Sequence, residues 1–284
     1  MKKILKKSAA ALAALTLTAA LAGCGSSASS AATSTDTTAS TAETSGENEL
    51  EKVKAAGKLV IGVEGTYPPF TYHDDNGELT GLDVELGKAL AEKLGVEVEF
   101  QEAAWDSLLI GIDTGRFDTV INSVSITDER AEKYDFSTPY AFNRTAVITK
   151  ADDDSINTLE DLKGKKTANT ISSTYAELAE QYGATVTGVD DLNQTFELLL
   201  SGRIDATLNA EMTFYDYTKE HPDANVKIAV LTDDANQIAI PMRKGDETAT
   251  LRTAIDAAID ELRADGTLKA LSEKYFGRDI STEE

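Results

Sequence analysis

The sequence contains little cysteine, histidine or tryptophan, and this scarcity narrows the chemistry that the chain can carry. Its 284 residues include one cysteine, two histidines and one tryptophan. A single cysteine cannot form a disulfide within the chain. His73 lies in a predicted turn and His221 precedes a proline, so neither belongs to a pattern typical of a metal site or a catalytic triad. We therefore expect no metal and no cofactor.

Basic residues are also scarce relative to acidic ones. The chain has 27 Lys and Arg against 49 Asp and Glu, and its formal net charge is -22. Such a charge repels nucleic acid and anionic lipid surfaces, so we exclude both as partners. It does not exclude a small anionic or zwitterionic ligand, because a nearby arginine outweighs a distant field that salt screens over about 8 to 10 Å.

The apolar run at the start of the chain is too short to span a membrane. Residues 9–20 follow a lysine-rich start, and they are fewer than the roughly 20 residues of a transmembrane helix. This layout is typical of a secretory signal peptide. The next four residues, L-A-G-C (21–24), resemble the lipobox of bacterial lipoproteins, which implies cleavage before Cys24 and a lipid on its sulfur. The alternative is an ordinary signal peptide and a cysteine that carries no lipid.

Residues 24–49 are predicted to be a disordered tether. The tract consists largely of Ser, Thr and Ala, which leaves almost nothing to bury. The roughly 235 residues that follow are enough for two lobes. We therefore predict a signal peptide at residues 1–23, a tether that begins with lipidated Cys24, and a fold that begins near Leu50.

Strand and helix patterns alternate through the folded part, which predicts an α/β fold with largely parallel sheets. Lys58–Val63 is predicted to be a strand and Leu82–Leu94 a helix, and a second series of the same type begins after Thr145. The tetrapeptides G-R-F-D (115–118) and G-R-I-D (202–205) each precede a predicted strand. This repeated pattern favours two similar lobes.

The stretch Asp118–Tyr134 contains the strongest candidate for a ligand site. Its first half alternates apolar and polar residues like a strand, and Thr127 is a suitable N-cap for the helix that follows. Arg130 lies in the first turn of that helix, and its guanidinium offers two donors that match the two oxygens of a carboxylate. The short polar residues nearby are Asn122, Ser123 and Ser125. An exposed arginine without a ligand is the alternative.

Four motifs occur in an order that identifies a family. They are I-G-V-E-G-T-Y-P-P-F (61–70), N-S-V-S-I-T-D-E-R-A-E-K-Y-D-F-S-T-P-Y (122–140), S-G-R-I-D-A (201–206) and D-G-T-L-K-A-L-S-E-K-Y-F-G (265–277). Together they resemble the extracytoplasmic solute-binding proteins of polar amino-acid ABC transporters, bacterial solute-binding protein family 3. The resemblance covers about residues 50–278.

The resemblance implies a periplasmic-binding-protein fold with a ligand enclosed between two α/β lobes. Two crossing strands would join the lobes, near Thr145–Thr149 and near Asn236–Met242. On this pattern, the first lobe holds residues 50–144 and 238–284. The second lobe, with the hinge strands, holds residues 145–237.

By position, the resemblance also implies a set of ligand-binding residues. Arg130 would bind the ligand carboxylate, and the turn at Ser173 and Thr174 would offer backbone N–H groups from the second lobe. Thr174 and Glu177 have the spacing of a capping box. Tyr67 and Trp105 would form aromatic walls. The full set is Glu64, Tyr67, Phe70, Trp105, Asn122, Ser123, Ser125, Arg130, Ser173, Thr174, Asn209 and Glu211.

The sequence departs from the family pattern at the group that would meet the ligand's ammonium. Many relatives have an aspartate where this chain has Ala210. Glu64 and Glu211 are the alternative acids, and Asn209 is a neutral acceptor. Within the family, I-S-S-T-Y-A-E-L (171–178) and L-N-A-E (208–211) most resemble binders of cystine or related sulfur amino acids. Binders of histidine, arginine and lysine are disfavoured, because no acidic side-chain pocket can be assigned.

The resemblance implies capture rather than catalysis. A monomer outside the cytoplasm, touching the membrane only through the lipid on Cys24, would enclose an amino acid and present it to a permease and ATPase complex. The chain has no G-x-S-x-G, H-E-x-x-H, Walker or G-x-G-x-x-G motif. The alternatives are a fold-related dehydratase that uses Glu64 as an acid or base, and a tethered sensor module that feeds a receptor.

Overall fold

The computed structural model describes residues 48–283. The predicted signal peptide, Cys24 and the tether up to residue 47 lie outside the described residues, so these remain predictions. No helix within residues 48–283 is both long and apolar enough to cross a membrane.

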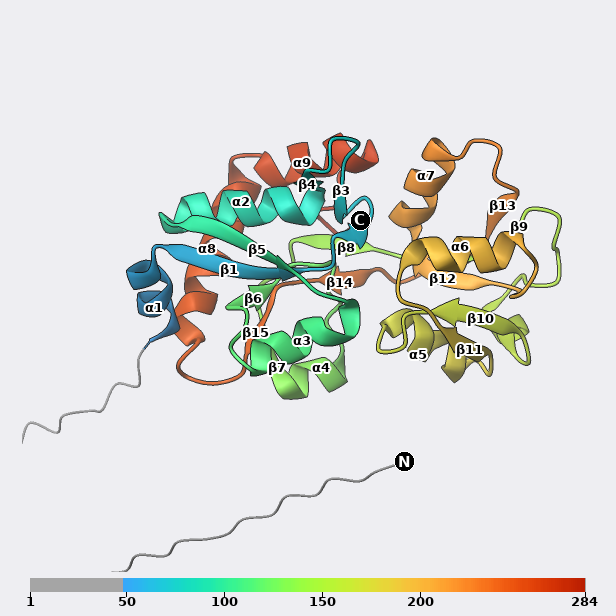
Figure 1. Cartoon of the computed structure of the whole chain (residues 1–284), viewed down its shortest axis with the longest axis horizontal. Coiled ribbons are helices and arrows are strands. Elements are labelled where there is room, and N and C mark those ends of the chain that lie inside the picture. Colours follow the sequence, from blue (N-terminus) through green and yellow to red (C-terminus); the bar gives the residue numbers. More distant parts are fainter. Residues whose placement is uncertain (1–47, 284) are drawn as a thin grey trace, which may run out of the picture. The chain divides into compact units, whose positions relative to one another are not determined.

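The first lobe is built on a parallel sheet with the strand order β5-β1-β6. The strand β1 (Lys58–Val63) pairs in parallel with β5 (Glu97–Glu102) and with β6 (Thr119–Val120). The helix α2 (Leu82–Leu94) connects β1 to β5, α3 (Trp105–Asp113) connects β5 to β6, and the two helices lie on opposite sides of the sheet (Figure 1). Right-handed crossovers that run in opposite directions along a sheet cover opposite faces, so this layout follows from the strand order.

Side chains of β1 alternate between the two faces of the sheet. Leu59, Ile61 and Val63 are fully buried in one apolar cluster together with Leu86 of α2. Val60 instead packs against a second cluster on the α3 side. The strand predicted at Lys58–Val63 is therefore confirmed, and its side chains show the two-residue period of a sheet covered on both faces.

The C-terminal helices return to the first lobe. Both α8 (Ala249–Ala264) and α9 (Thr267–Phe276) pack against α2. Ile255 and Leu268 are buried in the same apolar cluster as Leu86. The last part of the sequence therefore completes the core that the first part begins.

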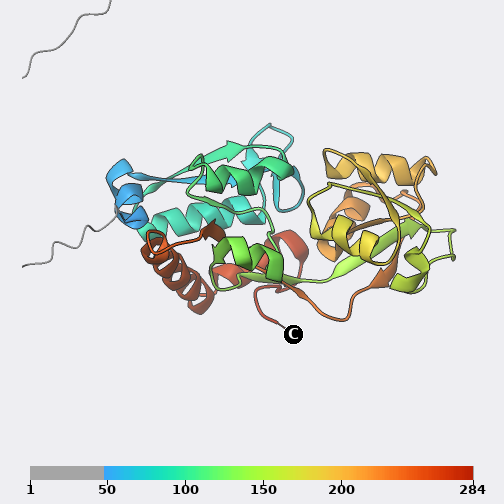
Figure 2. The same cartoon turned by 90° about the horizontal axis from the view of Figure 1, so that it is seen from below.

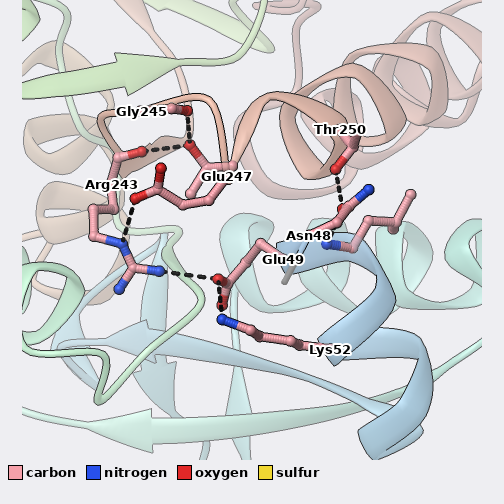
Figure 3. Close-up of polar contacts among 9 residues, drawn as sticks. Asn48, Glu49, Lys52, Arg243, Gly245, Glu247 and Thr250 are labelled. Carbon is pink, nitrogen blue, oxygen red and sulfur yellow. Dashed lines mark hydrogen bonds and ion pairs between the residues drawn. The ribbon is translucent and has the colours of Figure 1, made fainter. Parts of the chain in front are cut away.

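A polar cluster fastens the helix α1 (Glu49–Ala56) to the first lobe (Figure 3). The Glu49 carboxylate accepts a hydrogen bond from Arg243 at 2.9 Å. The Asn48 side chain caps α1 and also accepts a hydrogen bond from the Thr250 hydroxyl, at the start of α8. These contacts tie the beginning of the described chain to its C-terminal part.

The second lobe contains an antiparallel sheet, whereas largely parallel sheets were predicted. The strand β9 (Thr145–Lys150) lies between β12 (Thr207–Ala210) and β13 (Val226–Leu231) and is antiparallel to both. Because β9 carries the chain into this lobe and β13 carries it back, these two strands run in opposite directions. Parallel pairing occurs between β10 (Lys166–Asn169) and β11 (Thr185–Gly188).

Helices cover both faces of the β9 sheet. Ala146 and Ile148 belong to the apolar cluster of α6 (Leu192–Leu200), which includes Phe196. Val147 belongs to a different cluster on the side of α5 (Thr174–Gln181). This alternation along β9 gives the second lobe its own core.

Two chain segments join the lobes and run side by side (Figure 2). The strand β8 (Ala141–Asn143) pairs antiparallel with β14 (Asn236–Ile238). The Asn236 side chain donates a hydrogen bond to the Thr145 hydroxyl at 3.0 Å. Beyond this point the predicted crossing at residues 236–242 contains a second short strand, β15 (Pro241–Arg243), which pairs with β7 (Tyr134–Phe136).

Candidate functional site

A cavity lies between the two lobes and is lined largely by polar side chains. The first lobe contributes Glu64, Tyr67, Trp105, Asn122, Ser123, Ser125 and Arg130. The second lobe contributes Asn169, Thr170, Ser173, Thr174, Tyr175, Leu192, Thr195 and Asn209. Ten of the twelve residues predicted for the site are therefore brought together here. Their contact with a ligand remains a prediction.

Arg130 is a buried cation in the wall of this cavity. It lies in the first turn of α4 (Asp128–Lys133), which begins at the predicted N-cap: the Thr127 hydroxyl accepts a hydrogen bond from the Arg130 N–H at 3.2 Å. Its side chain is packed over the Trp105 ring, with 5.4 Å from Cζ to the ring centroid. Local sequence thus determines where the guanidinium enters the cavity.

The guanidinium of Arg130 bonds to carbonyl groups of both lobes. Nη1 donates to the Ser125 carbonyl at 3.1 Å, and Nη2 donates to the Ser172 carbonyl at 3.3 Å. Within residues 48–283 it forms no ion pair with a carboxylate, and its burial lowers its pKa. A buried charge without a counterion is costly. A ligand carboxylate would remove that cost.

The second lobe presents the beginning of α5 to the cavity. The N-cap is Ser173, whose hydroxyl accepts a hydrogen bond from the Ala176 N–H at 3.2 Å. The capping box predicted from Thr174 and Glu177 is therefore wrong: the helix is capped one residue earlier, and its N3 residue is Ala176. Ser173 and Thr174 both line the cavity, so the positive end of the α5 dipole faces it.

Direct hydrogen bonds connect the lobes around the cavity. The Tyr67 hydroxyl donates to Asn209 Oδ1 at 2.7 Å. The Ser172 hydroxyl contacts Asp106 at the start of α3. Together with the bond from Arg130 to Ser172, these contacts join residues of β2 (Thr66–Tyr67), α3 and α4 to the second lobe.

Glu64 supplies an acid to the cavity. Burial raises the pKa of its carboxyl to about 7, although hydrogen bonds from Asn122 and Thr66 act in the opposite direction. The Asn122 amide donates to Glu64 Oε2 at 3.3 Å. Asp191 and Asp106 raise the pKa further by repulsion. A ligand ammonium would favour the charged carboxylate, and contact of Glu64 with such a group remains a prediction.

Asn209 cannot act as the neutral acceptor that the sequence suggested. Its Oδ1 accepts hydrogen bonds from the Ala210 N–H at 2.9 Å and from the Tyr67 hydroxyl at 2.7 Å. The backbone donor fixes the orientation of the amide, because only the oxygen can accept from it. The amide NH2 is left as the group that can interact with a ligand, and this group is a donor.

Glu211 and Phe70 do not line the cavity, contrary to expectation. Glu211 is 2 % exposed and forms ion pairs with Arg278 and with Arg144 at the back of the hinge. Phe70 is buried between Tyr67 and Phe276, with ring centroids 5.1 and 5.5 Å away. In both cases a partner more than 60 residues distant in sequence directs the side chain, so local motifs could not reveal it.

Several cavity residues were missed from the sequence. They are Asn169, Thr170, Tyr175, Leu192 and Thr195. Asn169 is the last residue of the parallel strand β10 and Thr170 follows it, and ligands bind at the carboxyl ends of such strands. That rule could have identified these two residues. Leu192 and Thr195 lie on α6 with ordinary core spacing, which carried no such signal.

Residues 59–278 match the sequence model of the bacterial extracellular solute-binding proteins, family 3. The chain is 41% identical over 230 residues to the L-cystine-binding protein TcyA of Bacillus subtilis, which covers 81% of this chain and 85% of that protein.

Two solved structures extend the comparison. An ancestral arginine-binding protein bound to arginine is 39% identical, with a TM-score of 0.73, covering 78% of this chain and 99% of that one. The L-cystine solute receptor of Neisseria gonorrhoeae in its unliganded open conformation is 43% identical, with a TM-score of 0.57, covering 83% of this chain and 99% of that one. The overall structural similarity is thus higher to the arginine-bound protein than to the open receptor.

Proposed function

The chain belongs to the bacterial extracellular solute-binding proteins of family 3, and we propose that it captures an amino acid between its lobes and delivers it to an ABC importer. The observation that carries this proposal is the buried guanidinium of Arg130, which has no carboxylate partner within residues 48–283. An amino acid always provides a carboxylate, so this one cation would recognise the whole class.

Binding would favour the closed arrangement of the lobes. Arg130 belongs to the first lobe, and the beginning of α5 with Ser173 belongs to the second. A carboxylate that touches both interacts more strongly with the closed form than with an open one. A ligand with such a difference in affinity shifts the population toward closure. The importer would then recognise the closed form.

Cystine, or a related sulfur or polar amino acid, is the proposed ligand. The identity of 41% to a protein named for L-cystine binding supports this choice. Glu64 and the Asn209 amide add an acid and a donor to the cavity, so a ligand with polar groups beyond Arg130 has partners there. The acid also suits arginine, which makes arginine the informative competitor.

The lipid anchor is a separate part of the proposal. Cleavage before Cys24 and attachment of a lipid would hold the binder near a permease and ATPase complex, outside the cytoplasm. The support is the L-A-G-C sequence after the apolar run. Mass spectrometry of protein from membranes would detect a diacylglyceryl group on Cys24. A mature chain without lipid would refute the anchor and leave the capture proposal intact.

Calorimetry with the lipid-free protein tests the ligand. L-cystine is expected to bind more tightly than L-arginine, and the ligand recovered after incubation should be chemically unchanged. Ligand at one hundred times its dissociation constant adds about 2.7 kcal/mol to the free energy of unfolding, which a thermal shift detects. Absence of binding to every amino acid tested would refute capture. Recovery of an altered product would favour the dehydratase alternative.

A further inference from the structure

Ser123 has an unusual backbone conformation in the wall of the cavity. Its φ of 49° makes it the one non-glycine residue with positive φ among residues 48–283. Residues other than glycine occupy this left-handed region at an energetic cost, and they keep it only where the surroundings impose it. Ser123 is 8 % exposed, and its hydroxyl has no hydrogen-bond partner within the described chain. Something must therefore hold this residue in place.

The carboxylate of Asp83 is in contact with Ser123. The Ser123 N–H donates to Asp83 Oδ2 at 2.6 Å, and the Tyr140 hydroxyl donates to Asp83 Oδ1 at 2.8 Å. Asp83 is 0 % exposed and forms no ion pair within residues 48–283. The Ser123 N–H can only donate, so the group that faces it must be an acceptor, whereas the Tyr140 hydroxyl can donate or accept.

Asp83 is itself fixed by a turn that leads to another part of the cavity. It lies in the first turn of α2, and its N–H donates to the Phe70 carbonyl at 3.0 Å. The N–H of the preceding residue, Leu82, donates to the Pro69 carbonyl at 3.1 Å. Pro69 and Phe70 belong to a turn at residues 67–70, which begins with the cavity residue Tyr67. Asp83 thus joins two segments of the cavity wall, although it does not line the cavity.

We propose that Asp83 is a positioning residue for the ligand site: its carboxylate holds Ser123 in the left-handed conformation, so that the unpartnered Ser123 hydroxyl can bond to the ligand carboxylate beside Arg130. This inference rests on the proposed amino-acid capture. Asp83 acts through Ser123 and does not touch the ligand.

Asp83→Asn is the decisive substitution, because it preserves shape and removes one acceptor. The amide oxygen would still accept from the Ser123 N–H, but a neutral acceptor bonds more weakly than a carboxylate, and the NH2 would donate to the Tyr140 oxygen. The bond that holds Ser123 is then weakened, and we expect the dissociation constant for L-cystine to rise about 10-fold. Calorimetry gives the affinity, and circular dichroism confirms that the variant is folded.

Ser123→Gly provides the readout that a merely structural role would not change. Glycine adopts positive φ without being held. This variant loses the hydroxyl, so its own affinity falls. In its background, however, Asp83→Asn should cost less than about 3-fold, and this non-additivity is the signature of coupling between the two residues. Ser123→Ala still requires Asp83 to keep its left-handed backbone, so in this background Asp83→Asn should lower the free energy of unfolding. It should cost little affinity, because there is no hydroxyl to position.

The outcomes separate this inference from the proposed function. If the wild-type protein binds no amino acid, the proposed function has failed. If the wild type binds and Asp83→Asn binds equally well, or loses the same factor in all three backgrounds, the positioning role is refuted. Should Asp83→Asn alone fail to fold, the double variant with Ser123→Gly is expected to fold and to bind like Ser123→Gly. Failure of that double variant to fold would show a structural role only.

Discussion

Replacing Arg130 with alanine is the sharpest test of the capture site, and its size can be worked out from the structure. In the structure the guanidinium forms two hydrogen bonds to carbonyl oxygens and lies over the Trp105 ring. With a ligand it would form two charge-assisted bonds to a carboxylate. Each such bond contributes about 1.5 to 3 kcal/mol. The loss of both predicts a decrease in affinity on the order of 100-fold to 10,000-fold for every amino acid.

The same substitution should have little effect on the ligand-free protein. Burial lowers the pKa of Arg130, which shows that the folded environment disfavours its charge. Removing the side chain removes this cost together with the two hydrogen bonds, and the two effects oppose each other. We expect a change of less than about 1 kcal/mol in the free energy of unfolding, in either direction. Thermal melting should therefore be nearly unchanged without ligand, and the shift caused by ligand should disappear.

Arg116→Ala is the matched control for this experiment. Arg116 also lies over an aromatic ring of the first lobe, with Cζ 4.9 Å from the centroid of Phe117, but it does not line the cavity. The Arg116→Ala variant should therefore bind ligand with the same affinity as the wild type. If Arg130→Ala still gives a normal thermal shift and a normal calorimetric affinity, the assignment of the carboxylate site is wrong. If Arg116→Ala loses binding to a similar degree, the effect is not specific to the cavity.

Three other predictions concern stability, each measured by urea denaturation. Because the pKa of Glu64 is raised to about 7, the folded state keeps its proton where the unfolded state has lost it, so this residue reduces the free energy of unfolding as pH rises from about 4.5 to 7. The free energy of unfolding of Glu64→Gln should therefore exceed that of the wild type by on the order of 2 kcal/mol at pH 8 but not at pH 4. An equal difference at both pH values would contradict this. Arg278→Ala leaves the buried Glu211 carboxylate with one weaker partner and should lower the free energy of unfolding by about 2 to 4 kcal/mol, whereas Arg278→Lys should lower it less. Glu49→Ala removes the bond to Arg243 and should lower the free energy of unfolding by about 1 kcal/mol; no loss would show that this ion pair does not help to hold α1.

The local features of this protein could be predicted from the sequence. Lys58–Val63 was predicted to be a strand, and it forms β1. Thr127 was predicted to cap a helix that carries Arg130, and it does. Such features depend on residues two to four positions apart, so the pattern of neighbours determines them. Four motifs in order were also enough to identify the family.

The tertiary structure decided which side chains meet across the chain. Glu211 was predicted to line the site because it is acidic, but its ion pair with Arg278, 67 positions later, holds it at the hinge. Asn209 had the right position for an acceptor, but Ala210 and Tyr67 occupy its oxygen. Asp83 had no motif of its own, and only the approach of α2 to Ser123, 40 positions away, reveals what it holds. The physical reason is the same in each case: a hydrogen bond is directional and saturable, so a polar group's role is known only when its distant partners are known.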